Sequence, residues 1–301
     1  MNKLISFIKI LIITICLSIS HNNNLLATEN INEYILEEIT DNTANPYFSI
    51  PIRFGHTEFD FLITKHLILV TIAGILSIIS MKYLAHKLKR PFKRPTYIQN
   101  FLEVIINYMN KNIFSPTLGE EGKKYIPFCL TLFLFILFAN ILGIIPPLIK
   151  LPTENKHHFA YLAGGIGANI GFTGAVSFIV LITYIAAGIK KKGFFKYWAS
   201  LVPPHLPIVL VPIIWFLEFI TVFNRAFALT IRLFANIAGG HIMMIVIPYL
   251  IILFGTLLIS PIAIGFLSFI YILEIFVAVL QAYIFSLLSA VYISIAISDE
   301  H

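Results

Sequence analysis

Four charged side chains stand out in the last third of the sequence. Between residues 199 and 298 the only formally charged residues are Glu218, Arg225, Arg232 and Glu274. The other residues there suit lipid or packed helices. A charge within a membrane span costs about 3 kcal/mol or more, so an ionisable residue in such a segment is a candidate for function by default.

The first three of these residues share one helical face. Glu218, Arg225 and Arg232 are seven residues apart, close to two helical turns, and Asn236 extends the row by one turn. Glu218 lies about 21 Å along the helix from Arg232 and cannot be its partner. The counter-charge of Arg232 must come from Glu274 or from a carboxylate in a second subunit. The alternative to a functional role is that the side chains of Arg225 and Glu218, which lie in the first half of their helix, merely extend to the cytoplasmic interface.

A second polar face belongs to the final apolar segment. Glu274 and Gln281 are also seven residues apart, so the two polar faces could meet across a helical hairpin and hold water. His241 beside such a seam would have a pKa suited to proton transfer, although an ordinary hydrogen-bonded histidine is the alternative. Asn236 and Gln281 are weaker signals by themselves, because amides often only bridge helices.

The composition identifies the bilayer as the solvent of these segments. The chain of 301 residues is 58% hydrophobic and 12% charged, which leaves too little polar surface for a soluble globule. The formal charge of +6 does not indicate nucleic acid, because the basic residues cluster beside apolar runs as membrane loops do. Cys16 and Cys129 offer neither a disulfide framework nor metal-ligand spacing.

The N-terminal sequence predicts a leader followed by an exported segment. Lys3 and Lys9 precede a short apolar run, which predicts a signal peptide over residues 1–27 with cleavage near Ala27. Residues 28–60 are rich in Glu and Asp and are expected on the extracytoplasmic side of the membrane. The membrane domain should therefore occupy residues 61–301.

Three apolar segments and one amphipathic segment follow. Basic residues directly after the first span and after the third place both of those ends in the cytoplasm. The amphipathic segment has Ile98, Phe101, Leu102, Ile105 and Met109 on one face, which predicts an interfacial helix. The expected spans are Leu67–Leu84, Pro127–Ile149 and Phe159–Ile189.

The last two apolar stretches are unusually long. Ile208–Met244 and Ile262–Ser298 would each measure roughly 55 Å as a helix, against a hydrocarbon core of about 30 Å. Gly239, Gly240 and Pro248 favour breaks at the edges rather than the middle. We therefore expect a long, strongly tilted hairpin over residues 208–298. The predicted fold class is an all-α integral membrane protein with about five crossings, its N-terminus outside and its C-terminus cytoplasmic.

Several function classes are disfavoured. The patterns G-x-x-x-x-G-K-[ST], H-E-x-x-H and G-x-S-x-G are missing from the sequence, so no nucleotide, metal or cofactor site is expected. A proton-coupled secondary transporter, with Arg232 binding an anionic substrate and Glu274 coupling protons, is the alternative function. It predicts internal repeats, and none is found. An intramembrane enzyme would need paired catalytic groups, yet no aspartate lies between Asp60 and Asp299.

Three motifs resemble one known family. The stretch from Arg225 to His241 contains Arg-Leu-Phe-Ala-Asn and resembles the signature of subunit a of F-type ATP synthases. The segment Leu280–Tyr292, which includes Tyr283, is similar to the closing helix of that family, and Asn140–Pro146 is similar to its second-span motif. The resemblance covers roughly residues 55–301.

The resemblance implies a role for each motif residue. Arg232 would be the essential arginine that faces the rotating c-ring, and Glu218 would belong to the cytoplasmic half-channel. Arg225 and Tyr283 are secondary candidates. Family members usually have a proline after the position of Arg225, whereas this chain has Ala226. The residues implied to line the outer half-channel are Asn236, His241, Glu274 and Gln281.

The resemblance also implies a mechanism and partners. The chain would be a stationary, non-catalytic proton-channel subunit that contacts the c-ring and the b subunits in a bacterial inner membrane. Protons would neutralise a ring carboxylate, travel with the ring and leave on the cytoplasmic side. Some family members carry a carboxylate at the position of His241 and a histidine at that of Glu274, so this chain has the complementary arrangement.

Overall fold

The computed structural model describes most of the chain. The described residues are 48–54, 57–88, 96–144, 150–152, 159–161, 166–202, 207, 210–254 and 260–298. The predicted signal peptide lies outside them, and so does most of the acidic segment. The α-helices are α3 (Lys65–Leu88), α4 (Tyr97–Tyr108), α5 (Ser115–Gly122), α6 (Ile126–Ile144), α7 (Ile170–Lys192), α8 (Phe194–Ala199), α9 (Val211–Phe254) and α10 (Ser260–Ile297).

The predicted all-α membrane fold is confirmed. Five helical segments within the described residues are long and apolar enough to cross a bilayer: Lys65–Ala85, Gln99–Ile144, Ile170–Lys192, Val211–Met244 and Gly265–Ile297. Outside the helices, β1 (Phe48–Phe54) pairs with β2 (Thr57–Ile63) in an antiparallel hairpin, and β3 (Lys150–Pro152) pairs with β4 (Phe159–Tyr161). The chain is thus a multi-pass membrane protein with one short hairpin before α3 and another between α6 and α7.

Two predicted helix boundaries were wrong. The third span does not begin at Phe159, because residues 159–161 form β4 and the helix α7 begins at Ile170. Gly167 lies in a 3-10 turn, and a Cβ there would be 2.0 Å from Ile237 Cδ1. This glycine therefore permits a close approach between the turn and α9.

The second correction concerns the end of α9. We expected Gly239, Gly240 and Pro248 to end this helix, but it continues through all three to Phe254. With 44 residues in α9 and 38 in α10, the two helices are about 66 and 57 Å long. Neither fits upright within a core of about 30 Å. Giving up backbone hydrogen bonds in lipid would cost several kcal/mol, which favours a continuous helix over a break.

The segment between α4 and α6 changes its helical type twice. A π-helix, Met109–Phe114, follows α4 directly, and a 3-10 turn, Lys123–Tyr125, precedes α6. Gly119 within α5 has φ 62° and ψ −169°, a conformation that favours glycine. Ile106 of α4 and Met109, the first residue of the π-helix, are buried, whereas Phe101 is exposed. Met109 and Phe101 both belong to the predicted apolar face, which therefore is only partly packed within the chain.

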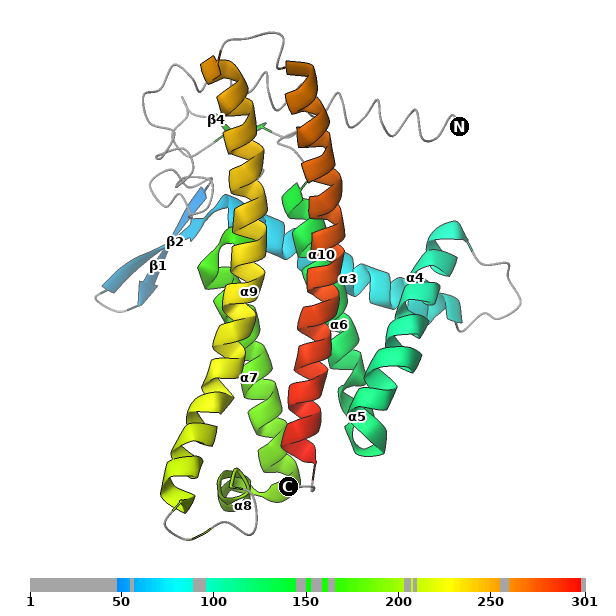
Figure 1. Cartoon of the computed structure of the whole chain (residues 1–301), viewed down its shortest axis with the longest axis vertical. Coiled ribbons are helices and arrows are strands. Elements are labelled where there is room, and N and C mark those ends of the chain that lie inside the picture. The colour runs from blue at the N-terminus through cyan, green and yellow to red at the C-terminus, as the bar shows by residue number, and fades with distance from the viewer. Residues whose placement is uncertain are drawn as a thin grey trace. The chain divides into compact units, whose positions relative to one another are not determined.

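The described residues belong to two compact units. The first comprises residues 1–73, 139–169 and 234–279, and the second comprises residues 74–138, 170–233 and 280–301. In the first unit Leu267 and Tyr271 of α10 form a core with Met244 and Ile247 of α9. Figure 1 shows α9 in yellow and orange running beside α10 in this region. These contacts confirm a helical hairpin here.

The second unit is held together by close contacts between its helices. The Tyr184 hydroxyl of α7 donates a hydrogen bond to the Val222 carbonyl of α9. Lys191 of α7 forms an ion pair with Glu121 of α5. A Cβ at Gly188 of α7 would lie 2.3 Å from a ring carbon of Tyr197 and 3.1 Å from the Ala296 carbonyl oxygen. Figure 1 shows α8 close to the end of α7 in agreement with this contact.

The close approach at Gly188 predicts a stability difference within one helix. We expect Gly188→Ala to lower the stability by about 1–3 kcal/mol, because the new methyl group would push against Tyr197 and a backbone carbonyl. Thermal unfolding of the chain in detergent, followed by circular dichroism, measures this loss. Gly174→Ala is the matched control, since the nearest atom to its Cβ would be 3.9 Å away. Equal melting temperatures for the two variants would contradict the packing argument.

Candidate functional site

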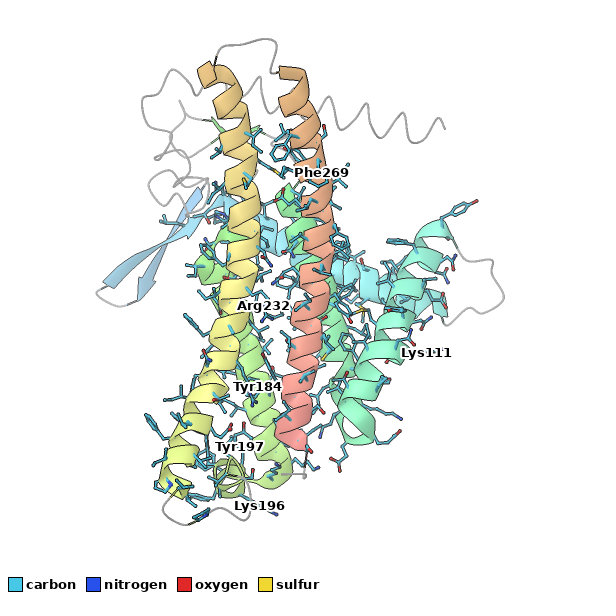
Figure 2. The ribbon with its side chains drawn as sticks, in the orientation of Figure 1. Lys111, Tyr184, Lys196, Tyr197, Arg232 and Phe269 are labelled. Carbon is cyan, nitrogen blue, oxygen red and sulfur yellow. The ribbon has the colours of Figure 1, made fainter. Side chains whose placement is uncertain are left out.

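The charged row predicted from the sequence lies on one continuous helix. Glu218, Arg225, Arg232 and Asn236 all belong to α9, so their spacing does place them along one side of it. Arg232 and Asn236 are exposed in this chain, whereas Glu218 and Arg225 are half-buried. Figure 2 labels Arg232 near the middle of α9. The row is therefore accessible from outside the chain at Arg232.

Arg232 has no counter-charge among the residues that the structure describes. No ion pair or hydrogen bond between described residues involves its guanidinium; the two ion pairs found there are Lys123–Glu120 and Lys191–Glu121. An exposed guanidinium in an apolar helix needs compensation, because an uncompensated charge in a span is costly. The chemistry of the site thus calls for an anion at this position.

Arg225, in contrast, lies against aromatic rings. Its guanidinium carbon is 5.5 Å from the ring centroid of Tyr292 on α10, within the range of a cation–π interaction. The Tyr292 ring also meets the Tyr184 ring edge-on, with centroids 6.1 Å apart. Arg225 therefore joins α9 to α10 and α7 within the second unit, which the sequence pattern did not reveal.

Glu274 is buried, unlike the other carboxylates whose side chains the structure describes. Only 7% of it is exposed, and neither carboxylate oxygen has a hydrogen-bond partner among the described residues. The carboxylate lies against the backbone of Gly240 on α9, where an added Cβ would be 2.8 Å from Glu274 Oε1. Gly240 thus provides the space that the glutamate side chain fills.

One further polar residue joins this region from α6. The Asn140 side chain is 2% exposed, and its Nδ2 donates a hydrogen bond of 3.2 Å to the carbonyl of Ala278, one turn after Glu274. The Oδ1 atom of Asn140 has no partner among the described residues. Asn140 was recognised in the sequence only as part of a motif. An amide within an apolar span was the signal that could have identified it as a contact residue.

The remaining candidates are distributed along the two long helices. Gln281 is 2% exposed and follows Glu274 by two turns on α10, and Tyr283 is half-buried on the same helix. His241 follows Gly240 in α9, and its side chain lies outside the described residues. The first unit thus brings together Gly240, Glu274 and the amide of Asn140. No group of His, Cys, Asp and Glu side chains suited to a metal ion occurs among the residues searched, which are the described ones.

Comparison with known proteins identifies one family. The sequence model described as ATP synthase A chain matches residues 65–294, which include α3 to α10 nearly to their end. A protein of Chloroherpeton thalassium named ATP synthase subunit a is 34% identical over 247 residues, covering 80% of this chain and 68% of that protein.

Two relatives from other organisms have the same name and similar identity to this chain. Proteins with the same name from Rubrobacter xylanophilus and Myxococcus xanthus are 35% and 32% identical, covering 69% and 80% of this chain. The matches cover 74% and 75% of those proteins. Residues 65–294, which the family model matches, include most of the two helices that carry the charged row and the buried glutamate. The chain therefore belongs to the ATP synthase A chain family.

Proposed function

We propose that this subunit is the stationary proton channel of an F-type ATP synthase. Two half-channels would deliver protons to a carboxylate of the rotating c-ring and release them on the other side. The observation that carries the proposal is the exposed guanidinium of Arg232, which has no counter-charge among the described residues. The subunit would take no part in ATP chemistry itself and would have no cofactor.

The exposure of Arg232 supports a partner carboxylate in another subunit. A fixed positive charge in apolar surroundings favours the ionised form of a carboxylate that lies opposite to it. The same charge repels a proton or hydronium that attempts to pass directly from one half-channel to the other. Arg232 would thus separate the two half-channels while allowing the ring carboxylate to pass.

The buried polar cluster supports an outer half-channel. Glu274, whose oxygens have no partner among the described residues, retains its full capacity to accept protons or bind water. The unused Oδ1 of Asn140 and the amide of Gln281 extend this polar path within α6 and α10. We assign His241 and Asn236, both on α9, to the same half-channel. Imidazole is the side-chain group that most often relays protons near neutral pH.

The other half-channel would lead to the cytoplasm. Glu218 lies two turns from the start of α9, near the lysine-rich end of α7, which the positive-inside rule places in the cytoplasm. Arg225 and Tyr283 would position the helices that line this exit. In this orientation the N-terminus lies outside and the C-terminus lies in the cytoplasm of a bacterial inner membrane. The b subunits would hold the chain still against the turning ring.

The driving force is electrical as well as chemical. One charge that crosses the membrane yields about 2.3 kcal/mol per 100 mV. A single step of this size falls well short of the cost of forming ATP, so several protons must be collected for each ATP. Rotation of the ring past Arg232 would perform this collection.

Replacement of Arg232 tests the proposal directly. In vesicles that contain the whole complex, Arg232→Ala should abolish ATP-driven proton pumping and ATP synthesis. Passive proton leak should persist or rise, because the barrier between the half-channels is gone. Ile213→Ala, which shortens an exposed apolar side chain near the start of α9, is the control and should retain coupling. Survival of coupled pumping in Arg232→Ala would refute the assigned role and favour the transporter alternative, which substrate uptake would then test.

A pair of adjacent glycines tests the role of the buried glutamate. Gly240→Ala would place a methyl carbon 2.8 Å from Glu274 Oε1, whereas a Cβ at Gly239 has nothing within 4 Å. Because the carboxylate is the mobile end of its side chain, the complex should still assemble while the carboxylate is displaced. We expect proton pumping to fall about tenfold to 100-fold in Gly240→Ala, since small misplacements of reacting groups have effects of this size.

Gly239→Ala provides the matched comparison. Both alanines raise helix propensity by the same amount, about 1 kcal/mol, so this contribution cancels between the variants. Assembly is checked by the yield of intact complex, and pumping is measured by the quenching of a pH-sensitive dye. Equal pumping by the two variants would show that the position of Glu274 is not important for proton transfer.

A further inference from the structure

The corner between α7 and α9 carries an unusual combination of side chains. The helix α7 ends in Lys190, Lys191 and Lys192, and Gly193, with φ 85°, starts the short helix α8. Two phenylalanines and Lys196 then follow within α8. Because α7 and α9 are both candidate membrane spans, the corner that joins their ends lies at a boundary between membrane and water.

Three contacts fix the orientation of α8. The Tyr197 side chain is 4% exposed and occupies the space beside Gly188 of α7. The indole Nε1 of Trp215 on α9 donates a hydrogen bond of 3.0 Å to the carbonyl of Trp198. The Trp198 ring also packs on Phe219, with ring centroids 5.5 Å apart. Tyr197 and Trp198 are thereby packed against α7 and α9, whereas the other side chains of α8 have no such contact among these three.

The exposed side chains of this corner are apolar and basic. Phe194 and Phe195 are 58% and 86% exposed, and their rings meet at right angles with centroids 5.5 Å apart. Lys190 and Lys196 are exposed as well. Figure 2 labels Tyr197 on the side of α8 that faces the rest of the second unit and Lys196 on the opposite side. Aromatic rings beside basic residues are typical of elements that lie in the membrane interface.

The positive charge of this corner is only partly balanced. Lys191 pairs with Glu121, and Lys192 donates a hydrogen bond to the Ser200 hydroxyl. No ion pair within the described part of the chain involves Lys190 or Lys196. The sequence contains no Asp or Glu from residue 155 to residue 217, so this segment supplies no acid of its own. An anion from outside the chain is the natural complement.

The geometry points to a binding site for the headgroup of an anionic phospholipid. Lys190 and Lys196 would hold the phosphate, while Phe194 and Phe195 would enter the boundary between headgroups and acyl chains. Basic residues near an anionic membrane surface raise affinity about fivefold each. The site does not depend on the proposed proton path, because none of its residues belongs to that path.

The two tryptophans of the chain provide a local reporter. Both Trp198 and Trp215 lie at this corner, and the chain has no other tryptophan. The full chain is placed in nanodiscs in which either phosphatidylglycerol or phosphatidylcholine carries bromine near the headgroup, at equal mole fraction. Bromine quenches tryptophan fluorescence only at short range. We expect stronger quenching by brominated phosphatidylglycerol than by brominated phosphatidylcholine.

Paired variants distinguish lipid binding at this corner from an effect of the total charge of the chain. Lys190→Gln with Lys196→Gln should bring the ratio of the two quenching values close to one, and Lys190→Arg with Lys196→Arg should keep the native ratio. Lys82→Gln with Lys111→Gln removes the same charge from exposed positions elsewhere and should leave the ratio unchanged. Phe194→Ser with Phe195→Ser should weaken quenching by both lipids. Circular dichroism confirms that each variant retains its helices.

Three outcomes would overturn the inference. A native ratio of one would mean that anionic lipid is not preferred at this corner. An equal drop of the quenching ratio in Lys190→Gln with Lys196→Gln and in Lys82→Gln with Lys111→Gln would show that the lipid preference depends on the total charge of the chain. Loss of the native preference on addition of inorganic phosphate alone would show that the lysines bind free phosphate rather than a membrane headgroup.

Discussion

The fold of this subunit depends on how it compensates ionisable side chains within apolar helices. A charge or an unpaired polar group in lipid is costly, so each one requires a partner or a function. The structure gives each of three such groups a different environment. Arg225 lies over the ring of Tyr292, Glu274 is buried against the backbone of Gly240, and Arg232 is exposed on α9. Neither the Glu274 carboxylate nor Arg232 has a partner among the described residues, and Arg232 is the one of the three that is exposed.

Glycine positions determine where the helices approach each other. Gly167, Gly188 and Gly240 each occupy a place where a Cβ would meet an atom within 3 Å. The neighbours that fill these spaces are Ile237, a ring carbon of Tyr197 and the Glu274 carboxylate. Small residues allow close helix packing in membranes, where burial of apolar surface provides little drive for association. In this chain the same device serves both helix packing and the placement of a buried carboxylate.

Much of the architecture was predictable from hydropathy, because span length and lysine-rich ends are strong signals. The hairpin of α9 and α10 and the common helix of Glu218, Arg225 and Arg232 followed from the spacing of charges in an apolar sequence. The end of α9 was not predictable from Gly239, Gly240 and Pro248. The tendency of these residues to break helices holds for proteins in water, where the freed backbone groups can bond to the solvent. The hydrogen bond from Asn140 to Ala278 joins residues 138 positions apart, and no local pattern reveals it.

The π-helix between α4 and α5 has a consequence for how sequences of this family should be aligned. A π-helix arises when one residue is inserted into an α-helix, and each residue turns a helix by about 100°. Deleting one residue from Met109–Phe114 would restore regular α-helix and rotate α4 about its own axis relative to α5. The surface that now buries Ile106 and Met109 would then face elsewhere. A gap of one position in this segment thus distinguishes relatives that present a different side of α4.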